Sequence, residues 1–119
     1  MRPERLYLND IVEAVDSIEG FLDGIKESEF LNNDLIRSAV LQKLTVIGEA
    51  AARLPEELCR QYPEVPWRDI IGFRNIAVHA YFAVEWPIVW VAATSDAPGL
   101  RNQVVQILAQ EFPVADSSS

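Results

Sequence analysis

The sequence predicts an all-α protein, a bundle of four main helices with short helical pieces between them. Apolar residues recur at three- and four-residue steps along most of the chain, which is the spacing of one face of a helix. Clusters of asparagine, aspartate, proline and glycine interrupt this pattern and mark the ends of the segments. Half of the 119 residues are apolar, which is enough for one core in a single domain.

The first helix is expected over residues 5–31. Acidic residues fill most of the positions between the apolar ones. Gly20 and Gly24 weaken the prediction locally, because each costs about 1 kcal/mol relative to alanine inside a helix. The apolar stripe consists of Ile11, Val15, Ile18, Leu22 and Ile25.

The second helix is expected over residues 34–54, after a break at residues 32–34 that supplies a helix N-cap. Pro55 ends this helix or opens a short one over residues 56–62, and a loop with a proline at each end follows. The apolar stripe of the second helix is Ile36, Val40, Leu44, Ile47 and Ala51. Close approach of a neighbouring helix is favoured by the small residues Ala39, Ala50 and Ala52.

The third helix starts at Pro66 or Trp67 and runs into the segment 74–81. It is apolar on most sides, so we expect it to be the buried central helix of the bundle. Its apolar residues are Ile70, Ile71, Phe73, Ile76, Ala77 and Val78.

The last third of the chain predicts two further helices. Pro87 suits the first turn of a fourth helix that ends near Ala93. A turn is expected over residues 94–99, where a proline and a glycine follow each other, and a fifth helix over residues 100–111. The helical domain is thus expected to occupy residues 1–112, with a disordered tail over residues 113–119.

The net charge of −8 argues against a protein that coats nucleic acid with its whole surface. The charge is unevenly distributed, however. Residues 1–34 carry nine acids against three bases, whereas residues 37–74 carry six bases against five acids. The sequence is therefore compatible with a local basic surface on an acidic protein.

The residue content excludes several kinds of site. Cys59 is the single cysteine, so the chain forms no internal disulfide and suits a reducing compartment. One cysteine and one histidine do not make a Cys/His zinc site within one chain. The N-terminus lacks the apolar core of a signal peptide, and no run reaches the roughly 18–20 apolar residues of a membrane span. We therefore expect a cytoplasmic protein with no metal, no cofactor, no membrane contact and an inert Cys59.

The stretch most suited to chemistry is residues 74–81, which gathers Arg74, Asn75, Tyr81 and the single histidine, His79. On one continuous helix Asn75 and His79 share a face. Arg74 and His79 are instead about 7.5 Å apart along the axis and turned by about 140°. One helix therefore does not aim both groups at one atom. Either the helix loosens near His79, or a second copy of the same helix completes the site across a two-fold axis.

Two copies of this stretch would supply the groups for acid–base cleavage of a phosphodiester. A neutral imidazole takes a proton, another cation protonates the leaving oxygen, and guanidinium groups bind the phosphoryl oxygens. On RNA, His79 would deprotonate the ribose 2′-hydroxyl and Arg74 would stabilise the phosphorane, while Asn75 orients His79 or contacts the phosphate. The expected products are a 2′,3′-cyclic phosphate and a 5′-hydroxyl, with no metal required and DNA inert.

The spacing Arg74-x4-His79-x-Tyr81 resembles the Arg-x4-His-x-Tyr motif of HepT-type toxins. These are HEPN-domain ribonucleases of the DUF86 family that are paired with a minimal nucleotidyltransferase (MNT) antitoxin. The likeness covers about residues 4–112 and includes the segments 39–51, 62–75 and 88–90. Arg-x4-His alone is frequent by chance, but the helix led by tryptophan before it and the His-x-Tyr-Phe after it make the resemblance specific. Ala80 departs from the family, where a polar or acidic residue is common.

The resemblance implies an antiparallel all-α HEPN bundle and a homodimer through the Arg74–His79 helix. It also implies metal-independent cleavage of RNA, in some members of tRNA, by the toxin of a type VII toxin–antitoxin system. In such systems the partner MNT transfers AMP from ATP to the motif tyrosine, here Tyr81, and silences the toxin. Bulk and negative charge two residues from His79 would oppose the binding of a substrate phosphate.

Each candidate residue also has a purely structural interpretation. His79 can be a hydrogen-bonding group near a helix end, and Tyr81 an aromatic at the edge of the core. Arg74 can cap a helix or pair with Glu49 or Asp69. Glu49 in turn either holds Arg74 or His79 in place or reaches solvent. Core or interface packing accounts for Trp67, Trp86 and Trp90.

Two other functions stay open on the sequence alone. The first is a non-catalytic HEPN module that binds nucleotides or RNA, or serves as a scaffold for its nucleotidyltransferase. The second is a helical dimerisation domain without a ligand. The presence of Arg74, His79 and Tyr81 together favours the enzyme, because binding alone does not need this set.

Overall fold

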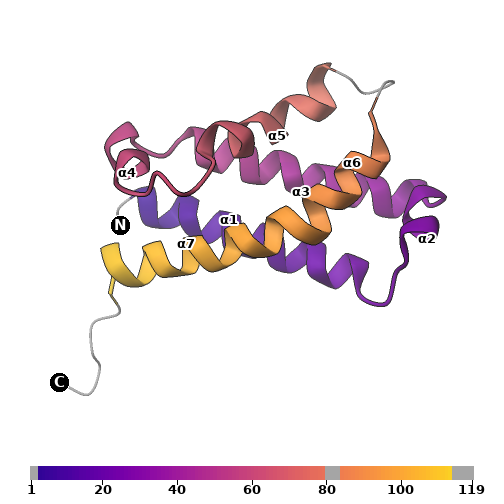
Figure 1. Ribbon diagram of the computed structural model, residues 1–119, viewed down its shortest axis with the longest axis horizontal. Coiled ribbons are helices and arrows are strands. Elements are labelled where there is room, and N and C mark those ends of the chain that lie inside the picture. The colour runs from indigo at the N-terminus through magenta and orange to yellow at the C-terminus, as the bar shows by residue number, and fades with distance from the viewer. Residues whose placement is uncertain (1–2, 80–83, 114–119) are drawn as a thin grey trace.

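The computed structural model describes residues 3–79 and 84–113, and for residues 76–79 it describes the helical backbone only. Within these residues all regular secondary structure is helical, which confirms the predicted all-α class. Neighbouring long helices run antiparallel (Figure 1). The long helices are α1 (Pro3–Leu22), α3 (Asp34–Ala52), α5 (Trp67–His79) and α7 (Ala97–Glu111). The short pieces are α2 (Glu27–Leu31), α4 (Glu56–Gln61) and α6 (Trp86–Val91).

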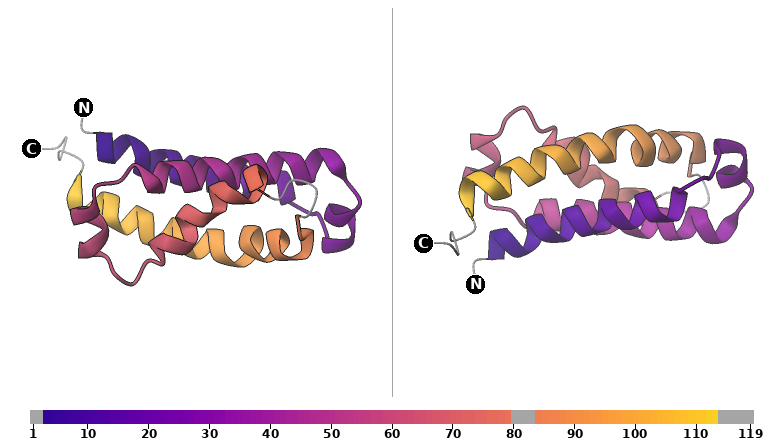
Figure 2. Two further views of the ribbon diagram at one scale, coloured as in Figure 1. Left: turned by 90° about the horizontal axis from the view of Figure 1, so that it is seen from above. Right: turned by 90° about the horizontal axis from the view of Figure 1, so that it is seen from below.

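The helix at the centre of the bundle is α1. It packs against α3 on one side and α7 on the other, and α3 packs in turn against α5 (Figure 2). The residues of the predicted apolar stripe that lie inside α1 are buried or half-buried, and its acidic residues from position 13 onward are exposed. The largest fully buried side chains include Leu8, Ile11, Ile18, Phe30, Leu44, Ile47 and Ile107.

The third long helix, α5, lies at an edge of this arrangement. The prediction that it is the buried central helix is wrong. Among its side chains up to Asn75, only Trp67 and Ile70 are buried, while Ile71 and Phe73 are half-buried. The reason is that α3 is its principal packing partner and covers one face. A largely apolar sequence thus presents part of its surface at the outside of the bundle.

The helix predicted over residues 5–31 is divided into two. The first piece, α1, ends at Leu22, and α2 begins at Glu27. Gly24 between them has φ +71°, in the left-handed region that residues with a side chain rarely adopt. The backbone N–H of Lys26 then donates to Glu29 Oε1 at 2.9 Å and helps to start α2.

The second predicted helix is confirmed, with its cap. The side chain of Asn33 accepts a hydrogen bond from the backbone N–H of Ile36 at 3.0 Å, which satisfies one of the free donors at the start of α3. Along the predicted stripe four residues are buried and Ile36 is half-buried. Pro55 directly precedes the short helix α4, which confirms the predicted alternative that it opens a short helix.

The turn predicted over residues 94–99 is helical instead. A π-helical segment, η2 (Ala92–Asp96), joins α6 to α7, so the chain is helical from Trp86 to Glu111. Inside an α-helix a proline lacks an N–H and crowds the carbonyl four residues earlier. In this chain the wider π turn of η2 precedes Pro98, which lies near the start of the next α-helix. Pro98 therefore occupies the first turn of α7, where proline is tolerated, just as Pro87 does in α6.

Polar contacts join segments that are distant in the sequence. The Trp67 indole N–H donates to the Tyr62 carbonyl at 3.0 Å, and the Tyr62 hydroxyl donates to Glu111 Oε2 at 2.6 Å. On α7, Arg101 Nε lies 2.6 Å from Asp16 Oδ1 of α1. These contacts hold the start of α5 near the end of α7. None of the helices that the structure describes is long and apolar enough to cross a bilayer.

Candidate functional site

The predicted site residues Arg74, Asn75 and His79 all lie on α5. This helix is α-helical through His79, and the residues directly after the histidine lie outside the described part of the chain, so the alternative that the helix loosens near His79 stays a prediction. Arg74 is half-buried and Asn75 is exposed. The side chain of His79 and the whole of Tyr81 lie outside the described residues, as do residues 114–119 of the predicted tail.

The geometry of a continuous helix therefore applies to the site. Asn75 and His79 are four residues apart and share one face, where side chains at this spacing meet. Arg74 is turned away from His79 by about 140°. On a single copy of α5, positions 75 and 79 therefore share one face, and position 74 lies on another.

The backbone of Arg74 is supported by α3 at Gly48. A Cβ built on Gly48 would lie 2.6 Å from the backbone nitrogen of Arg74 and 3.1 Å from the carbonyl oxygen of Ile71. The two helices are in backbone contact at this point because position 48 has no side chain. Gly48 is buried.

Glu49, predicted as a supporting residue, is exposed on α3. It lines a hollow together with Tyr7 and Asp10 of α1 and Arg53. No salt bridge joins Glu49 to Arg74 among the side chains that the structure describes. Its proposed contact with His79 falls outside the described side chains and stays a prediction.

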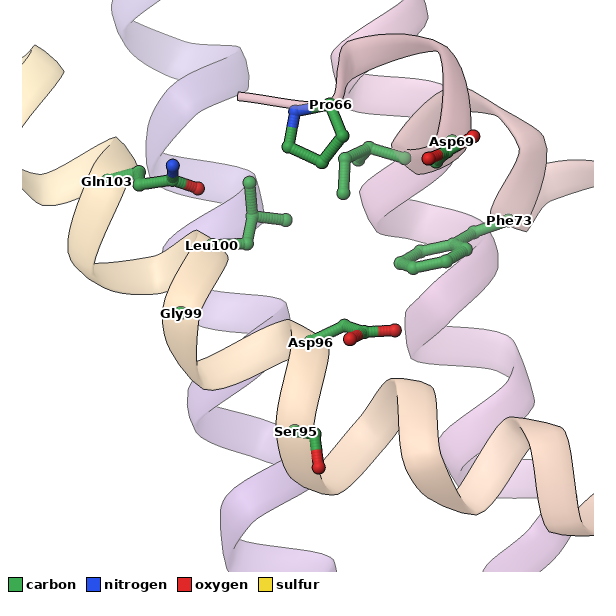
Figure 3. Close-up of a pocket in the computed structure, with 9 residues that line it drawn as sticks. Pro66, Asp69, Phe73, Ser95, Asp96, Gly99, Leu100 and Gln103 are labelled. Carbon is green, nitrogen blue, oxygen red and sulfur yellow. The ribbon is translucent and has the colours of Figure 1, made fainter. Parts of the chain in front are cut away.

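A groove of about 480 Å³ separates α5 from η2 and α7 (Figure 3). Asp69 on α5 and Asp96 on η2 stand on opposite walls of it, and Phe73 projects from α5 into the space between them. Among the residues that line it, both charged groups are acidic, so the groove disfavours a phosphate. The remaining lining residues are Pro66, Ile70, Ser95, Gly99, Leu100 and Gln103.

The other chemically active groups take no part in the site. Burial and the nearby Glu56 raise the pKa of the Cys59 thiol, which keeps it protonated and unreactive at neutral pH. Trp67 is buried, and Trp86 and Trp90 are half-buried against Phe30, so these three residues pack as predicted. Within the described part of the chain, no three His, Cys, Asp or Glu side chains lie close enough together to hold a metal ion.

An antiparallel all-α bundle of this kind is consistent with the fold class of HEPN-type domains. The family model of the HepT-like ribonucleases matches residues 11–107. The chain belongs to this family.

The chain is similar in sequence to named proteins of three organisms. The "Probable ribonuclease HepT" of Thermococcus cleftensis is 36% identical over 102 residues, which are 86% of this chain and 93% of that protein. MJ1380 of Methanocaldococcus jannaschii, named as an inferred RNase, is 34% identical over 87% of this chain and 94% of its own length. TTE0752 of Caldanaerobacter subterraneus, named in the same way, is 32% identical over 93% of this chain and 99% of its own length. No significant match was found among solved structures.

One close contact at the candidate site, that of Gly48 with Arg74, was not predicted from the sequence. The close contact of Gly48 with Arg74 joins residues far apart in the chain, so no local pattern shows it. The available signal was a glycine in the middle of a helix beside small residues, which favours close helix approach without naming the partner.

Proposed function

We propose that this protein is a metal-independent endoribonuclease that acts as the toxin of a type VII HEPN/MNT toxin–antitoxin system. The observation that carries the proposal is the family match together with the Arg74-x4-His79-x-Tyr81 motif, whose first two members lie on one edge helix. The substrate class is RNA, with tRNA or mRNA as the candidates.

His79 and Arg74 divide the chemistry between them. The neutral imidazole of His79 removes the proton from a ribose 2′-hydroxyl, whose oxygen attacks the adjacent phosphorus. The guanidinium of Arg74 stabilises the extra negative charge of the phosphorane. The bond to the 5′-oxygen breaks, and that oxygen takes a proton from a second cationic group. The products are a 2′,3′-cyclic phosphate and a 5′-hydroxyl, and Asn75 orients His79 or contacts the phosphate.

The active form in this proposal is a homodimer through α5. A continuous helix turns Arg74 away from His79, so a second α5 across a two-fold axis brings the arginine of one subunit to the histidine of the other. The edge position of α5 leaves a face available for such a contact. On α6, Ile88 and Val91 add exposed apolar surface at 59% and 52% exposure.

Tyr81 is the proposed control point. A cognate minimal nucleotidyltransferase transfers AMP from ATP to it. The phenol oxygen attacks the α-phosphorus, the bond to pyrophosphate breaks, and the phenolic proton is lost to solvent. The added nucleotide places bulk and negative charge two residues from His79, where a substrate phosphate binds. Intact mass after co-expression with the transferase should rise by AMP-sized steps, and the rise should be absent in Tyr81→Phe.

Cleavage of RNA by the purified protein tests the enzyme directly. Wild type, His79→Ala and Arg74→Ala are incubated with tRNA in EDTA, and the fragment ends are analysed by mass. We expect 2′,3′-cyclic phosphate and 5′-hydroxyl ends from wild type, and a loss of at least a hundredfold in each variant, because general base and charge stabilisation each contribute about that much. A substrate with a 2′-deoxy group at the cleavage position should be inert.

Arg68→Ala is the matched control, because Arg68 is an exposed arginine on the same helix and lies outside the motif. Cleavage that survives in His79→Ala would remove the catalytic role of the histidine. RNA or nucleotide binding by wild type without any cleavage would instead favour the non-catalytic HEPN module, which serves as a partner or scaffold of the nucleotidyltransferase.

A further inference from the structure

The helices α3 and α5 of the site approach each other closely at Gly48. A Cβ at this position would lie 2.6 Å from the backbone nitrogen of Arg74, 3.0 Å from its Cβ and 3.1 Å from the carbonyl oxygen of Ile71. Real Cβ atoms essentially never approach another heavy atom closer than 3.0 Å. With α5 in its present place, position 48 therefore accommodates glycine and no larger residue.

This contact distinguishes Gly48 from the other glycines. A Cβ at Gly20, Gly24, Gly72 or Gly99 would meet no atom within 4 Å. Gly48 also lies in the middle of α3, where glycine is less favourable than alanine for the helix itself. The absence of a side chain therefore serves the contact between α3 and α5 and not the conformation of α3.

The atoms that a Cβ at position 48 would meet are the backbone nitrogen and Cβ of Arg74 and the backbone carbonyl oxygen of Ile71. They cannot move aside as the end of a flexible side chain would, so any added group at position 48 must shift α5 itself. Among the residues that the structure describes, none forms a salt bridge or hydrogen bond with the Arg74 guanidinium. The placement of this group thus depends on where the backbone of Arg74 is held.

We propose that Gly48 is a positioning residue for Arg74, which sets the spacing of α3 and α5 so that the guanidinium reaches the scissile phosphate. This inference rests on the proposed ribonuclease function. Relief of a 2.6 Å contact to an ordinary van der Waals distance requires a shift of about 1 Å, and a misplacement of that size can lower a rate about a hundredfold. The loss should fall mainly on kcat, because Arg74 acts on charge that develops in the transition state.

The test compares Gly48→Ala with two controls at a temperature where circular dichroism shows each protein folded. Gly20→Ala adds a methyl group to α1 in open space and should cleave RNA like wild type. Val104→Ala removes buried volume from α7, whose main packing partners are α1 and η2, and so lowers stability. We expect Gly48→Ala to lose roughly tenfold to a hundredfold in kcat with KM changed less. An equal loss in Val104→Ala would overturn the proposal, since destabilisation alone would then explain the effect.

A double-mutant cycle separates an action through Arg74 from an independent one. If Gly48 acts by placing Arg74, the Gly48→Ala change should have little further effect in the Arg74→Ala background. Multiplicative losses in the double variant would overturn the proposal. Rates of weakly active variants are measured in single turnover with enzyme in excess.

A crystal structure of Gly48→Ala tests the positioning without reference to activity. Superposition on α1, α3 and α7 should show α5 displaced at Arg74, while an unmoved α5 would overturn the inference. If wild type cleaves no RNA but α5 is displaced, the proposed function fails and the structural role of Gly48 stands, so the two failures are distinguishable.

Discussion

The guanidinium carbon of Arg37 lies 4.9 Å from the centre of the Trp86 ring. Arg37 belongs to α3 and Trp86 is the first residue of α6, so the contact holds the start of α6 against the bundle. Phe30 of α2 packs on the same indole, with ring centres 6.2 Å apart at an angle of 72°. Arg37 also donates to the Leu31 carbonyl at 3.2 Å and pairs with Asp34. One arginine therefore links α2, α3 and the start of α6.

Removal of this link should destabilise the protein. We expect Arg37→Ala to lower the free energy of unfolding by about 1–3 kcal/mol, because a cation–π contact and a hydrogen bond from a charged group are lost together. Arg37→Lys keeps the charge but not the planar group, so its loss should be intermediate. Urea unfolding measures both. Arg60→Ala is the control, since its salt bridge with Glu56 is exposed and should contribute less than about 1 kcal/mol. Equal losses in Arg37→Ala and Arg60→Ala would contradict this account.

The two glycines near the end of α1 should respond in opposite directions to the same substitution. Gly20 lies inside the helix with open space around it, so Gly20→Ala should stabilise the protein by about 0.5–1 kcal/mol. Gly24 has φ +71°, so Gly24→Ala should destabilise it by about 1–2 kcal/mol. Thermal unfolding monitored by circular dichroism compares the two. A shift of both melting temperatures in the same direction would show that the conformation of Gly24 is not the cause.

This pair also shows where prediction of the fold from sequence ends. The apolar spacing predicts the long helices and most of their buried residues, because a helix must bury one face. It does not tell which of two glycines four residues apart takes a left-handed conformation, so the sequence predicts an unbroken helix over residues 5–31. The Pro98-Gly99 pair predicts a turn, because a local pattern does not reveal that a π segment precedes it.

For the site, the sequence supplied the residue types and their spacing but not their surroundings. Arg74, Asn75 and His79 lie on one helix as predicted. Which partners cover that helix is a tertiary property, and this is why α5 was predicted to be central although it lies at an edge. The contact of Gly48 with Arg74 is missed for the same reason.

The hydrogen bond from Tyr62 to Glu111 predicts a stability change at high pH. This bond, with burial and the nearby carboxylates, raises the pKa of Tyr62 from 10 to about 12. The neutral hydroxyl donates, whereas the phenolate cannot and is repelled by the carboxylate. The contribution to stability is therefore complete below about pH 10 and is lost as the pH rises through about 12.

Tyr62→Phe tests this dependence. At neutral pH the variant should be less stable than wild type by about 1 kcal/mol, the usual contribution of such a hydrogen bond. The difference should shrink between about pH 10 and pH 12. Denaturant unfolding at several pH values measures it, and Glu111→Gln should weaken the pH dependence because the charge that opposes ionisation is removed. A difference that is constant across this range would refute the assignment.

Subunit complementation tests whether two copies of α5 share one active site. Arg74→Ala and His79→Ala homodimers should each be inactive on RNA. In the mixed dimer, one intact arginine and one intact histidine come from different subunits. If a site takes Arg74 from one subunit and His79 from the other, the mixed dimer regains one complete site. If each subunit uses its own pair, both of its sites lack a group and the mixed dimer is inactive.

The measurement uses co-expressed variants with two different affinity tags, so that tandem purification isolates the mixed dimer. RNA cleavage by this species is compared with that of each homodimer purified in the same way. A His79→Ala homodimer whose two subunits carry the two different tags controls for the effect of the tags. Because α5 stays helical through His79 and turns Arg74 away from it by about 140°, we expect activity to return in the mixed dimer. Full inactivity of the mixed dimer, with its dimeric state verified by light scattering, would place arginine and histidine in the same subunit and would require α5 to change its shape when RNA binds.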